Sequence, residues 1–110
     1  MTDSTSLGDF EQLVLLAVLQ LGREARAAEV RRRIEEAAER SVSRGALYAT
    51  LDRLVAKGLV EWEVEESSPA RGGIPRRCFR LTKRGIVALR RAYRAVSRLA
   101  DGLGGVLEGA

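Results

Sequence analysis

The most chemically distinctive feature of this sequence is a block of cationic side chains that contains no acidic residue. Residues 67–100 include ten lysines and arginines and no aspartate or glutamate, whereas residues 1–66 hold 13 acidic and nine basic residues. A block of this kind binds an anionic surface, either nucleic acid phosphates or lipid headgroups. The alternative is a solvated helix face in an arginine-rich protein, because arginine outnumbers lysine 17 to 2.

Other reactive residues are scarce, and this scarcity excludes several classes of enzyme. The 110 residues include no histidine and a single cysteine, Cys78. Disulfides within the chain, thiolate-rich zinc sites and histidine-dependent catalysis are therefore excluded. We expect no catalytic residues, no metal ligands and no cofactor. Cys78 is predicted either to sense redox state or to fill a small apolar position in a strand.

The lengths of the apolar runs and the polarity of the first residues predict where in the cell the protein lies. No run reaches the roughly 18 apolar residues that span a bilayer. Residues 1–9 lack the order of cationic and then apolar residues that marks a signal peptide. We therefore expect a soluble, cytoplasmic protein without a membrane partner.

Three helices are predicted before the basic block. Residues 7–21 are apolar on nearly every side, and Gly22 is placed to end this helix. A helix of this kind must be buried on more than one side, so we expect its second side to face another subunit. Residues 26–40 form a second helix with a narrow apolar stripe. Ser43 is a suitable N-cap for a third helix over residues 44–57.

A hairpin and a last helix follow. Residues 59–65 alternate between apolar and polar, residues 77–81 form a shorter strand, and the segment between them contains both prolines and a Gly-Gly pair. Thr82 can cap a helix over residues 83–107, whose glycine-rich end we expect to fray. This helix carries a heptad-spaced apolar seam: Ile86, Leu89, Tyr93, Val96, Ala100, Leu103 and Leu107. The seam packs either against a second subunit, which we favour, or on its own domain.

The order of these elements predicts the fold class, which is mainly α (α+β). Helix, helix, tight turn, helix and two-stranded hairpin is the order of a winged helix-turn-helix, here over residues 7–82. Residues 83–107 would then form a long C-terminal dimerisation helix. In such a fold the helix over residues 44–57 enters the DNA major groove, and the hairpin is the wing.

The predicted interfaces follow from this arrangement. On the helix over residues 44–57, small side chains surround a few polar ones on the face opposite the core, so that the backbone can approach a groove. The predicted DNA contacts of this helix are Ser43, Arg44, Gly45, Ala46, Tyr48, Ala49, Thr50 and Arg53. Those of the wing are Arg71, Gly72, Gly73, Arg76 and Arg77. The predicted dimer interface consists of Phe10, Leu13, Leu16, Leu89, Tyr93, Val96, Ala100 and Leu103.

Two of these assignments have a structural alternative. Arg53 is predicted either to read a base or to form a salt bridge with a glutamate of the second helix. Tyr48 is predicted either to contact a phosphate or to close the edge of the core. Trp62 is assigned to packing within its strand, because it alternates with Val60 and Val64.

Three segments of the sequence resemble the PadR-type transcriptional regulators. They are GDFEQLVLLAVLQLG (8–22), VSRGALYATLDRLVAKGLV (42–60), which is the most specific, and RGGIPRRCFRLTKRG (71–85). The resemblance implies a dimeric bacterial repressor of the winged-helix type, with the first and last helices in the dimer interface. The single C-terminal helix is similar to the shorter subgroup of the family.

The sequence also departs from the family pattern at three places. An aromatic residue is usual near Ala27 and Ala28, and this chain has none there. Ile74 stands where a basic wing residue is common, so this chain lacks one cationic side chain of the family's wing. Cys78 replaces the first of two usual aromatic residues in the second strand.

Together these features predict a sequence-specific, DNA-binding transcriptional regulator. We expect a dimeric repressor that binds a palindromic operator in double-stranded DNA through the helix over residues 44–57 and the basic wing. The alternative is a winged-helix dimer whose main role is to sense a small molecule or bind a protein, and any effector has no signature in the sequence. A further hypothesis is that the last helix binds a membrane surface, but such a helix needs a broad apolar face, and the seam here is narrow.

Overall fold

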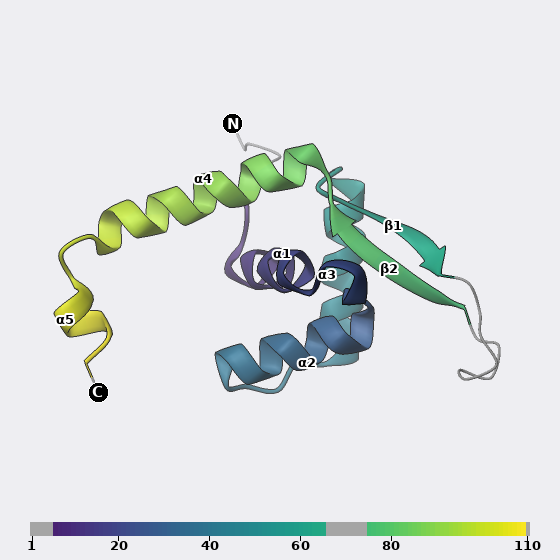
Figure 1. The fold of residues 1–110 in the computed structure, drawn as a ribbon, viewed down its shortest axis with the longest axis horizontal. Coiled ribbons are helices and arrows are strands. Elements are labelled where there is room, and N and C mark those ends of the chain that lie inside the picture. The colour runs from purple at the N-terminus through teal and green to yellow at the C-terminus, as the bar shows by residue number, and fades with distance from the viewer. Residues whose placement is uncertain (1–5, 66–74, 110) are drawn as a thin grey trace.

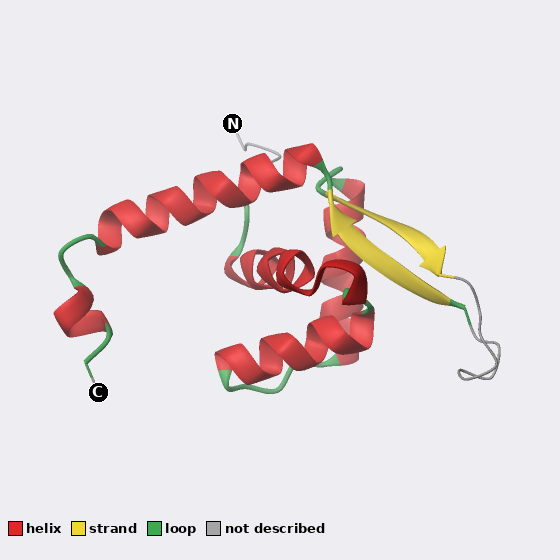
Figure 2. Cartoon of the chain, viewed as in Figure 1, coloured by secondary structure: helices red, strands yellow, loops and turns green. Residues whose placement is uncertain are grey.

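A computed structural model describes residues 6–65 and 75–109 of the chain. Its elements are, in order, α1 (Asp9–Leu21), the short 3-10 helix η1 (Gly22–Glu24), α2 (Ala27–Ala38), α3 (Arg44–Ala56), β1 (Val60–Glu65), β2 (Arg76–Leu81), α4 (Lys83–Ala100) and α5 (Gly104–Leu107). Helices α1, α2 and α3 pack together, the hairpin lies beside α3, and α4 leads away as an arm that ends in α5 (Figure 1). This mainly helical fold with one two-stranded antiparallel sheet confirms the predicted winged helix-turn-helix class (Figure 2).

The predicted helix caps set the observed boundaries. Ser43 Oγ accepts a hydrogen bond from the Ala46 N–H at 3.1 Å, and Thr82 Oγ1 accepts one from the Gly85 N–H at 3.0 Å. Each bond satisfies a backbone donor that the first turn of a helix leaves without a partner. Gly22 ends α1 with φ at +56°, a conformation that favours glycine. The predicted starts of α3 and α4 are therefore confirmed.

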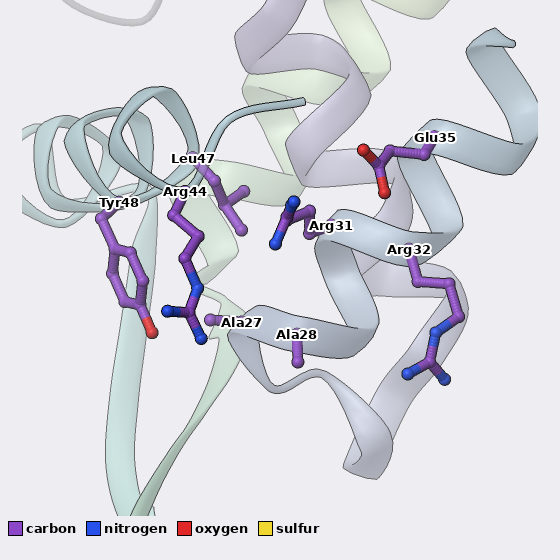
Figure 3. Close-up of a pocket in the computed structure, with 8 residues that line it drawn as sticks. All are labelled: Ala27, Ala28, Arg31, Arg32, Glu35, Arg44, Leu47 and Tyr48. Atoms are coloured by element: carbon purple, nitrogen blue, oxygen red, sulfur yellow. The ribbon is translucent and has the colours of Figure 1, made fainter. Parts of the chain in front are cut away.

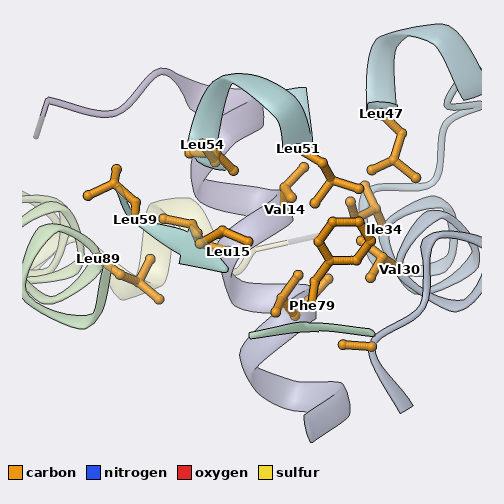
Figure 4. Packing of buried hydrophobic residues seen from close by; sticks show 14 of the residues in the cluster. Val14, Leu15, Val30, Ile34, Leu47, Leu51, Leu54, Leu59, Phe79 and Leu89 are labelled. Carbon is orange, nitrogen blue, oxygen red and sulfur yellow. The ribbon is translucent and has the colours of Figure 1, made fainter. Parts of the chain in front are cut away.

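The core lies where the three N-terminal helices meet the hairpin and the start of α4 (Figure 4). Phe79 of β2 is its largest buried side chain, and it projects from the hairpin toward Val14 of α1 and Val30 of α2 (Figure 4). Helix α3 contributes Leu47, Leu51 and Leu54. Burial of these side chains fixes the helix pair and the hairpin as one unit.

Leu89 also belongs to this core, so its assignment to the dimer interface is wrong. Its side chain is buried within the single chain, near Leu59 and Leu15 (Figure 4). The first turns of α4 pack against α1 and the hairpin. Heptad spacing shows that one side of a helix is apolar, but it does not show where along the helix the covering partner changes.

The two strands pair in antiparallel register from Val60 opposite Leu81 to Glu65 opposite Arg76. The predicted alternation is present, but only the base of the hairpin is covered. Val60 is buried, whereas Trp62 is 41% exposed and Val64 is exposed, because the hairpin projects past the helices (Figure 1). Cys78 is half-buried, and its thiol donates a hydrogen bond to the Arg23 carbonyl at 3.4 Å.

The last predicted helix is interrupted. Helix α4 ends at Ala100, and Gly102 then adopts φ at +80° before the single turn of α5. This turn breaks the heptad seam before Leu103, so the expectation of one frayed helix over residues 83–107 is corrected to two helices. Gly102 favours the turn because it adopts a positive φ without steric cost.

Within the described parts of the chain, no helix is long and apolar enough to cross a bilayer.

Candidate nucleic-acid interface

The solvent-facing side of α3 presents small side chains around Arg44. Ser43, Arg44, Gly45, Ala46 and Ala49 are all exposed. Apart from its two chain neighbours and the nearby backbone of α3, no heavy atom would lie within 4 Å of a Cβ added at Gly45, so this part of the helix faces open space. Because small residues let a helix backbone approach a groove closely, this face has the shape that major-groove insertion requires.

Thr50 does not belong to this face, which corrects its assignment as a DNA contact. The residue is only 3% exposed, and its hydroxyl accepts a hydrogen bond from Arg53 Nη2 at 3.3 Å. It lies three residues after Leu47 and four before Leu54, and both of these leucines are buried. Residues at such spacing share one side of a helix, so Thr50 points with them toward the core.

Arg53 is tied to the body of the domain by an ion pair. Its Nε lies 3.3 Å from Glu11 Oε2, while Lys57 Nζ lies 2.8 Å from the same oxygen. The salt-bridge alternative therefore occurs, but its partner is on α1 and not on the second helix. Burial alone would raise the pKa of the Glu11 carboxyl, but hydrogen bonds from the Gly8 N–H, Lys57 and Arg53, with the charge of Lys57, lower that pKa below its ordinary value.

A basic depression adjoins the exposed face of α3, and sequence reasoning missed half of it. A surface cavity of about 250 Å³ lies between α2 and α3. Figure 3 shows Arg44 and Tyr48 of α3 on one side and Arg31 and Arg32 of α2 on the other. The small side chains at the start of α2 form its floor: Ala27 and Ala28.

The three arginines of this depression differ in exposure: one is fixed within the fold, and two reach solvent. Arg31 Nε donates a hydrogen bond to the Val42 carbonyl at 2.7 Å, so this guanidinium is fixed in place. Arg32 and Arg44 are exposed and reach solvent. The sequence did not single out Arg31 and Arg32, and the available signal was their position on the helix that precedes the recognition helix. Three arginines and one acidic residue, Glu35, line the open hollow, so its lining carries a net positive charge that attracts anionic oxygens.

A second cavity, of about 360 Å³, lies between the start of α2, Tyr48 and the wing. Arg76, Arg77 and Pro75 line it from the wing side. Arg26 Nε and Nη2 donate to the two carboxylate oxygens of Glu65 at 2.6 and 2.7 Å, which raises the pKa of Arg26 and ties the start of α2 to the end of β1. The wing therefore continues the basic surface of α2 and α3.

The predicted wing contacts are only partly visible. Arg76 is half-buried in β2, and Arg77 points toward α3, where its guanidinium lies beside aromatic rings. The remaining three predicted wing residues lie outside the described residues: Arg71, Gly72 and Gly73.

Apart from Leu89, which is buried in the core, the predicted dimer-interface residues fall into two groups. Tyr93, which is 66% exposed, Val96, Leu16 and Leu103 carry large apolar surfaces that face solvent in the single chain. Ala100 is half-buried, and Phe10 and Leu13 are partly buried against the core. The arm continues this apolar surface through two side chains that the prediction did not include, Leu99 and Val106, each at least 80% exposed.

Comparison with known proteins decides the family. The model of the transcriptional regulator PadR-like family matches residues 15–91, which is more than half of the chain. The chain belongs to the PadR-like family of transcriptional regulators. This PadR-like regulator has the winged-helix fold of a DNA-binding protein, as its sequence predicted. Among curated proteins the comparison finds no match.

Solved structures support the same fold. A PadR-like transcription factor from Bacteroides fragilis is 25% identical with a TM-score of 0.71, and the match covers 88% of each chain. A PadR family transcriptional regulator from Eggerthella lenta is 29% identical with a TM-score of 0.64, over 90% of this chain and 84% of that one. A PadR-like regulator from Bacillus cereus, 22% identical over 92% and 93% of the two chains, shares the fold with a TM-score of 0.72.

Proposed function

We propose that this PadR-like regulator is a homodimeric repressor that binds a palindromic operator. The observation that carries the proposal is the exposed small-residue face of α3 beside the arginines of the basic depression. Arg44 lies at the N-terminal turn of α3, the part of a recognition helix that meets base edges. Arg31 and Arg32 lie on the flank, where guanidinium groups meet phosphates.

The wing extends this surface beyond the recognition helix. Arg76 stands at the start of β2 opposite Glu65, whose carboxylate is bound by Arg26. Arg76 adjoins the second cavity together with Arg77 and Pro75, so its positive charge lies on the surface that continues from α2 and α3. We assign Arg71, Gly72 and Gly73 to the same contact region on the strength of the sequence.

The proposed dimer is supported by apolar surface that the single chain does not cover. Residues 7–82 form the DNA-binding unit in this proposal, and residues 83–107 form the dimerisation arm. Tyr93, Val96 and Leu99 project from α4 beyond the domain, where no part of the described chain buries them. Large contiguous apolar surfaces on soluble proteins mark interaction sites, and a second copy would cover this one symmetrically.

The proposal is tested by selecting binding sites from a pool of random duplex DNA. A two-fold dimer places its two recognition helices about one helical turn apart, ~34–36 Å, so the selected sites should be imperfect palindromes. The best site should bind at least ~10³-fold more tightly than random duplex at the same salt concentration. Selected sites without two-fold symmetry would contradict the dimeric repressor. Equal affinity for random duplex would contradict sequence-specific binding.

A further inference from the structure

Arg77 of the wing lies among aromatic side chains from three elements. Its guanidinium carbon is 4.9 Å from the ring centre of Trp62 on β1, 5.4 Å from that of Phe79 on β2 and 5.8 Å from that of Tyr48 on α3. A guanidinium within about 6 Å of a ring centre is attracted by the electrons of the ring face. Arg77 therefore bridges both strands of the wing to the recognition helix.

Arg77 also faces the acidic residue of α3. Its Nη1 lies 4.0 Å from Asp52 Oδ1, whose side chain is mostly exposed on the flank of α3. Asp52 is the only acid between residues 44 and 56. An unpaired carboxylate at this place would repel the phosphates that approach α3. The charge of Arg77 offsets that of Asp52, so the pair together presents no net charge to DNA.

The burial of Arg77 differs from that of its neighbour on the opposite face of the strand. The Arg77 side chain is 34% exposed, whereas that of Arg80 is 58% exposed and pairs with Glu61 and Glu63. The two residues carry the same charge on the same strand, but only Arg77 reaches α3. The sequence predicted Arg77 as a phosphate contact, and its surroundings favour a different role.

We propose that Arg77 is a positioning residue that docks the wing on the recognition helix and neutralises Asp52. This inference rests on the proposed DNA-binding function and deepens it. A two-stranded hairpin is marginally stable by itself, so contacts at its base and side must set its direction. Arg77 supplies the side contact with α3, and it thereby fixes how far the wing stands from the recognition helix on the duplex.

Trp62 makes the docking measurable without DNA, because it is the only tryptophan of the chain. Arg77→Ala removes the guanidinium from the ring, so the emission of Trp62 should shift and its quenching by acrylamide should increase. Arg80→Ala is the matched control, since it removes the same charge from the opposite face of β2 and should leave Trp62 unchanged. Unchanged emission and quenching in Arg77→Ala would overturn the docking.

Binding to the selected operator tests the role of the pair with Asp52. Asp52→Asn should change the affinity by about twofold at most in the parent protein, where Arg77 already offsets the charge. In the Arg77→Ala background it should restore about fivefold or more, the size of coupling expected between residues in contact. Equal effects of Asp52→Asn in the two backgrounds would show that Arg77 and Asp52 act independently, which contradicts the proposal.

The salt dependence separates positioning from phosphate contact. Each lost phosphate contact lowers the slope of log affinity against log salt by about 0.9. The double variant Arg77→Ala, Asp52→Asn has the net charge of the parent, so a positioning role predicts the parental slope. A slope reduced by about 0.9 per wing would assign Arg77 to a phosphate and overturn the inference.

Two further outcomes are decisive. If Arg77→Ala does not fold, as circular dichroism would show, Arg77→Gln, which also removes the charge, replaces it in the operator and salt measurements, and Arg77→Lys replaces it in the Trp62 measurement. Lysine keeps the charge and loses the planar group, so full parental behaviour in Arg77→Lys contradicts a stacked, positioning guanidinium. If no duplex is bound specifically by the parent protein, the proposed function fails, while the Trp62 measurement still decides whether the wing docks through Arg77.

Discussion

Glu11 of α1 and Lys57 at the end of α3 are joined by a 2.8 Å ion pair, although 46 residues separate them in sequence. Both ends of the pair are partly or fully removed from solvent, and the same carboxylate also meets Arg53. The Gly8 N–H donates to the other oxygen of Glu11 at 2.8 Å. The start of the first helix is thus fixed to the end of the recognition helix by charge as well as by apolar packing.

The first prediction concerns this carboxylate. Glu11→Gln keeps the shape and removes the charge, leaving two cations without their partner. We expect a loss of about 1–3 kcal/mol in the free energy of unfolding at neutral pH, typical of hydrogen bonds to charged groups that are partly buried. Thermal or urea unfolding measures this loss. Glu61→Gln, which removes an equally charged but exposed side chain, is the control and should cost much less.

The pH dependence of the same pair has a definite sign. The folded pKa of Glu11 lies below its ordinary value of 4.5. Its stabilisation is therefore complete above that value, and it is lost as the pH falls through the folded pKa. The difference in stability between the parent and Glu11→Gln should shrink as the pH is lowered below about 4.5. A constant difference down to acid-induced unfolding would contradict the assignment of a lowered pKa.

The ion pair illustrates what the sequence could and could not predict. Caps, periodicity and turn residues act over a few neighbours, so Ser43, Thr82 and the winged-helix order could be predicted from them. The partner of Arg53 could not, because a glutamate on α1 and one on α2 are equally plausible until the helices are packed. The prediction for Thr50 was wrong for a related reason. The sequence pattern around a small polar residue among leucines does not show whether its side chain lies on the flank of the helix or in the core.

Two larger features also depended on how the helices pack, and the sequence alone could not predict them: the boundary of the core along α4 and the basic depression. The apolar spacing of α4 could be predicted from the sequence, but neither its interruption at Gly102 nor its division between the core and solvent could, because that division depends on where α4 leaves the domain. Leu89 is covered by the chain's own core, and Tyr93, four residues further, is exposed. The basic depression could not be predicted from the sequence either, because Arg31 and Arg44 come together only when α2 and α3 pack against each other.

A second prediction concerns Gly85 at the start of α4. A Cβ at this position would lie 2.1 Å from the Leu59 carbonyl oxygen, which belongs to the backbone and cannot rotate out of the way as a flexible side chain could. Gly85→Ala must therefore move α4 away from the hairpin, and we expect a loss of roughly 1–3 kcal/mol or more in unfolding free energy. Chemical denaturation of the variant measures it. Stability equal to that of the parent would contradict the close approach of α4 to Leu59.

Gly45 supplies a matched comparison and a third prediction. Gly45→Ala places a methyl group in open space within α3, so it should raise stability by about 0.5–1 kcal/mol through the higher helix propensity of alanine. The same methyl group would stand between the α3 backbone and the groove. We expect the selected operator to bind more weakly although the protein is more stable. Unaltered operator affinity would place this part of α3 away from the duplex.

The fourth prediction separates the core from the proposed dimer surface. Val96→Asp puts a charge on an exposed part of α4, so it should convert the dimer into a 12.0 kDa monomer while the domain remains folded. Leu89→Ala should instead cost about 2–4 kcal/mol in unfolding free energy, because it opens a cavity in the core. Light scattering and circular dichroism distinguish the two effects. A monomeric parent at tens of micromolar, or a Val96→Asp variant that stays dimeric, would place the interface elsewhere.

The last prediction assigns different roles to two arginines of the basic depression. Arg44 stands at the N-terminal turn of α3 and Arg32 on the outer side of α2, and both are exposed (Figure 3). Arg32→Ala should weaken binding to operator and random duplex alike and lower the salt slope by about 0.9 per site, because phosphates carry no base identity. Arg44→Ala should weaken operator binding more than binding to random duplex, by about 1–3 kcal/mol if the guanidinium reads a guanine.

Arg40→Ala is the control for these two variants, since its guanidinium lies 5.4 Å from the ring centre of Phe10, near the opposite end of α2. Removing this charge should leave the affinity for operator and the ranking of operator variants unchanged at physiological salt, where charges further away than about 8 Å are screened. Equal losses for both DNAs in Arg44→Ala would move Arg44 to a phosphate, and a changed ranking of operator variants in Arg32→Ala would move Arg32 to a base. The two results together would place α2 and not α3 in the groove, which contradicts the proposed orientation of the helix pair on the duplex.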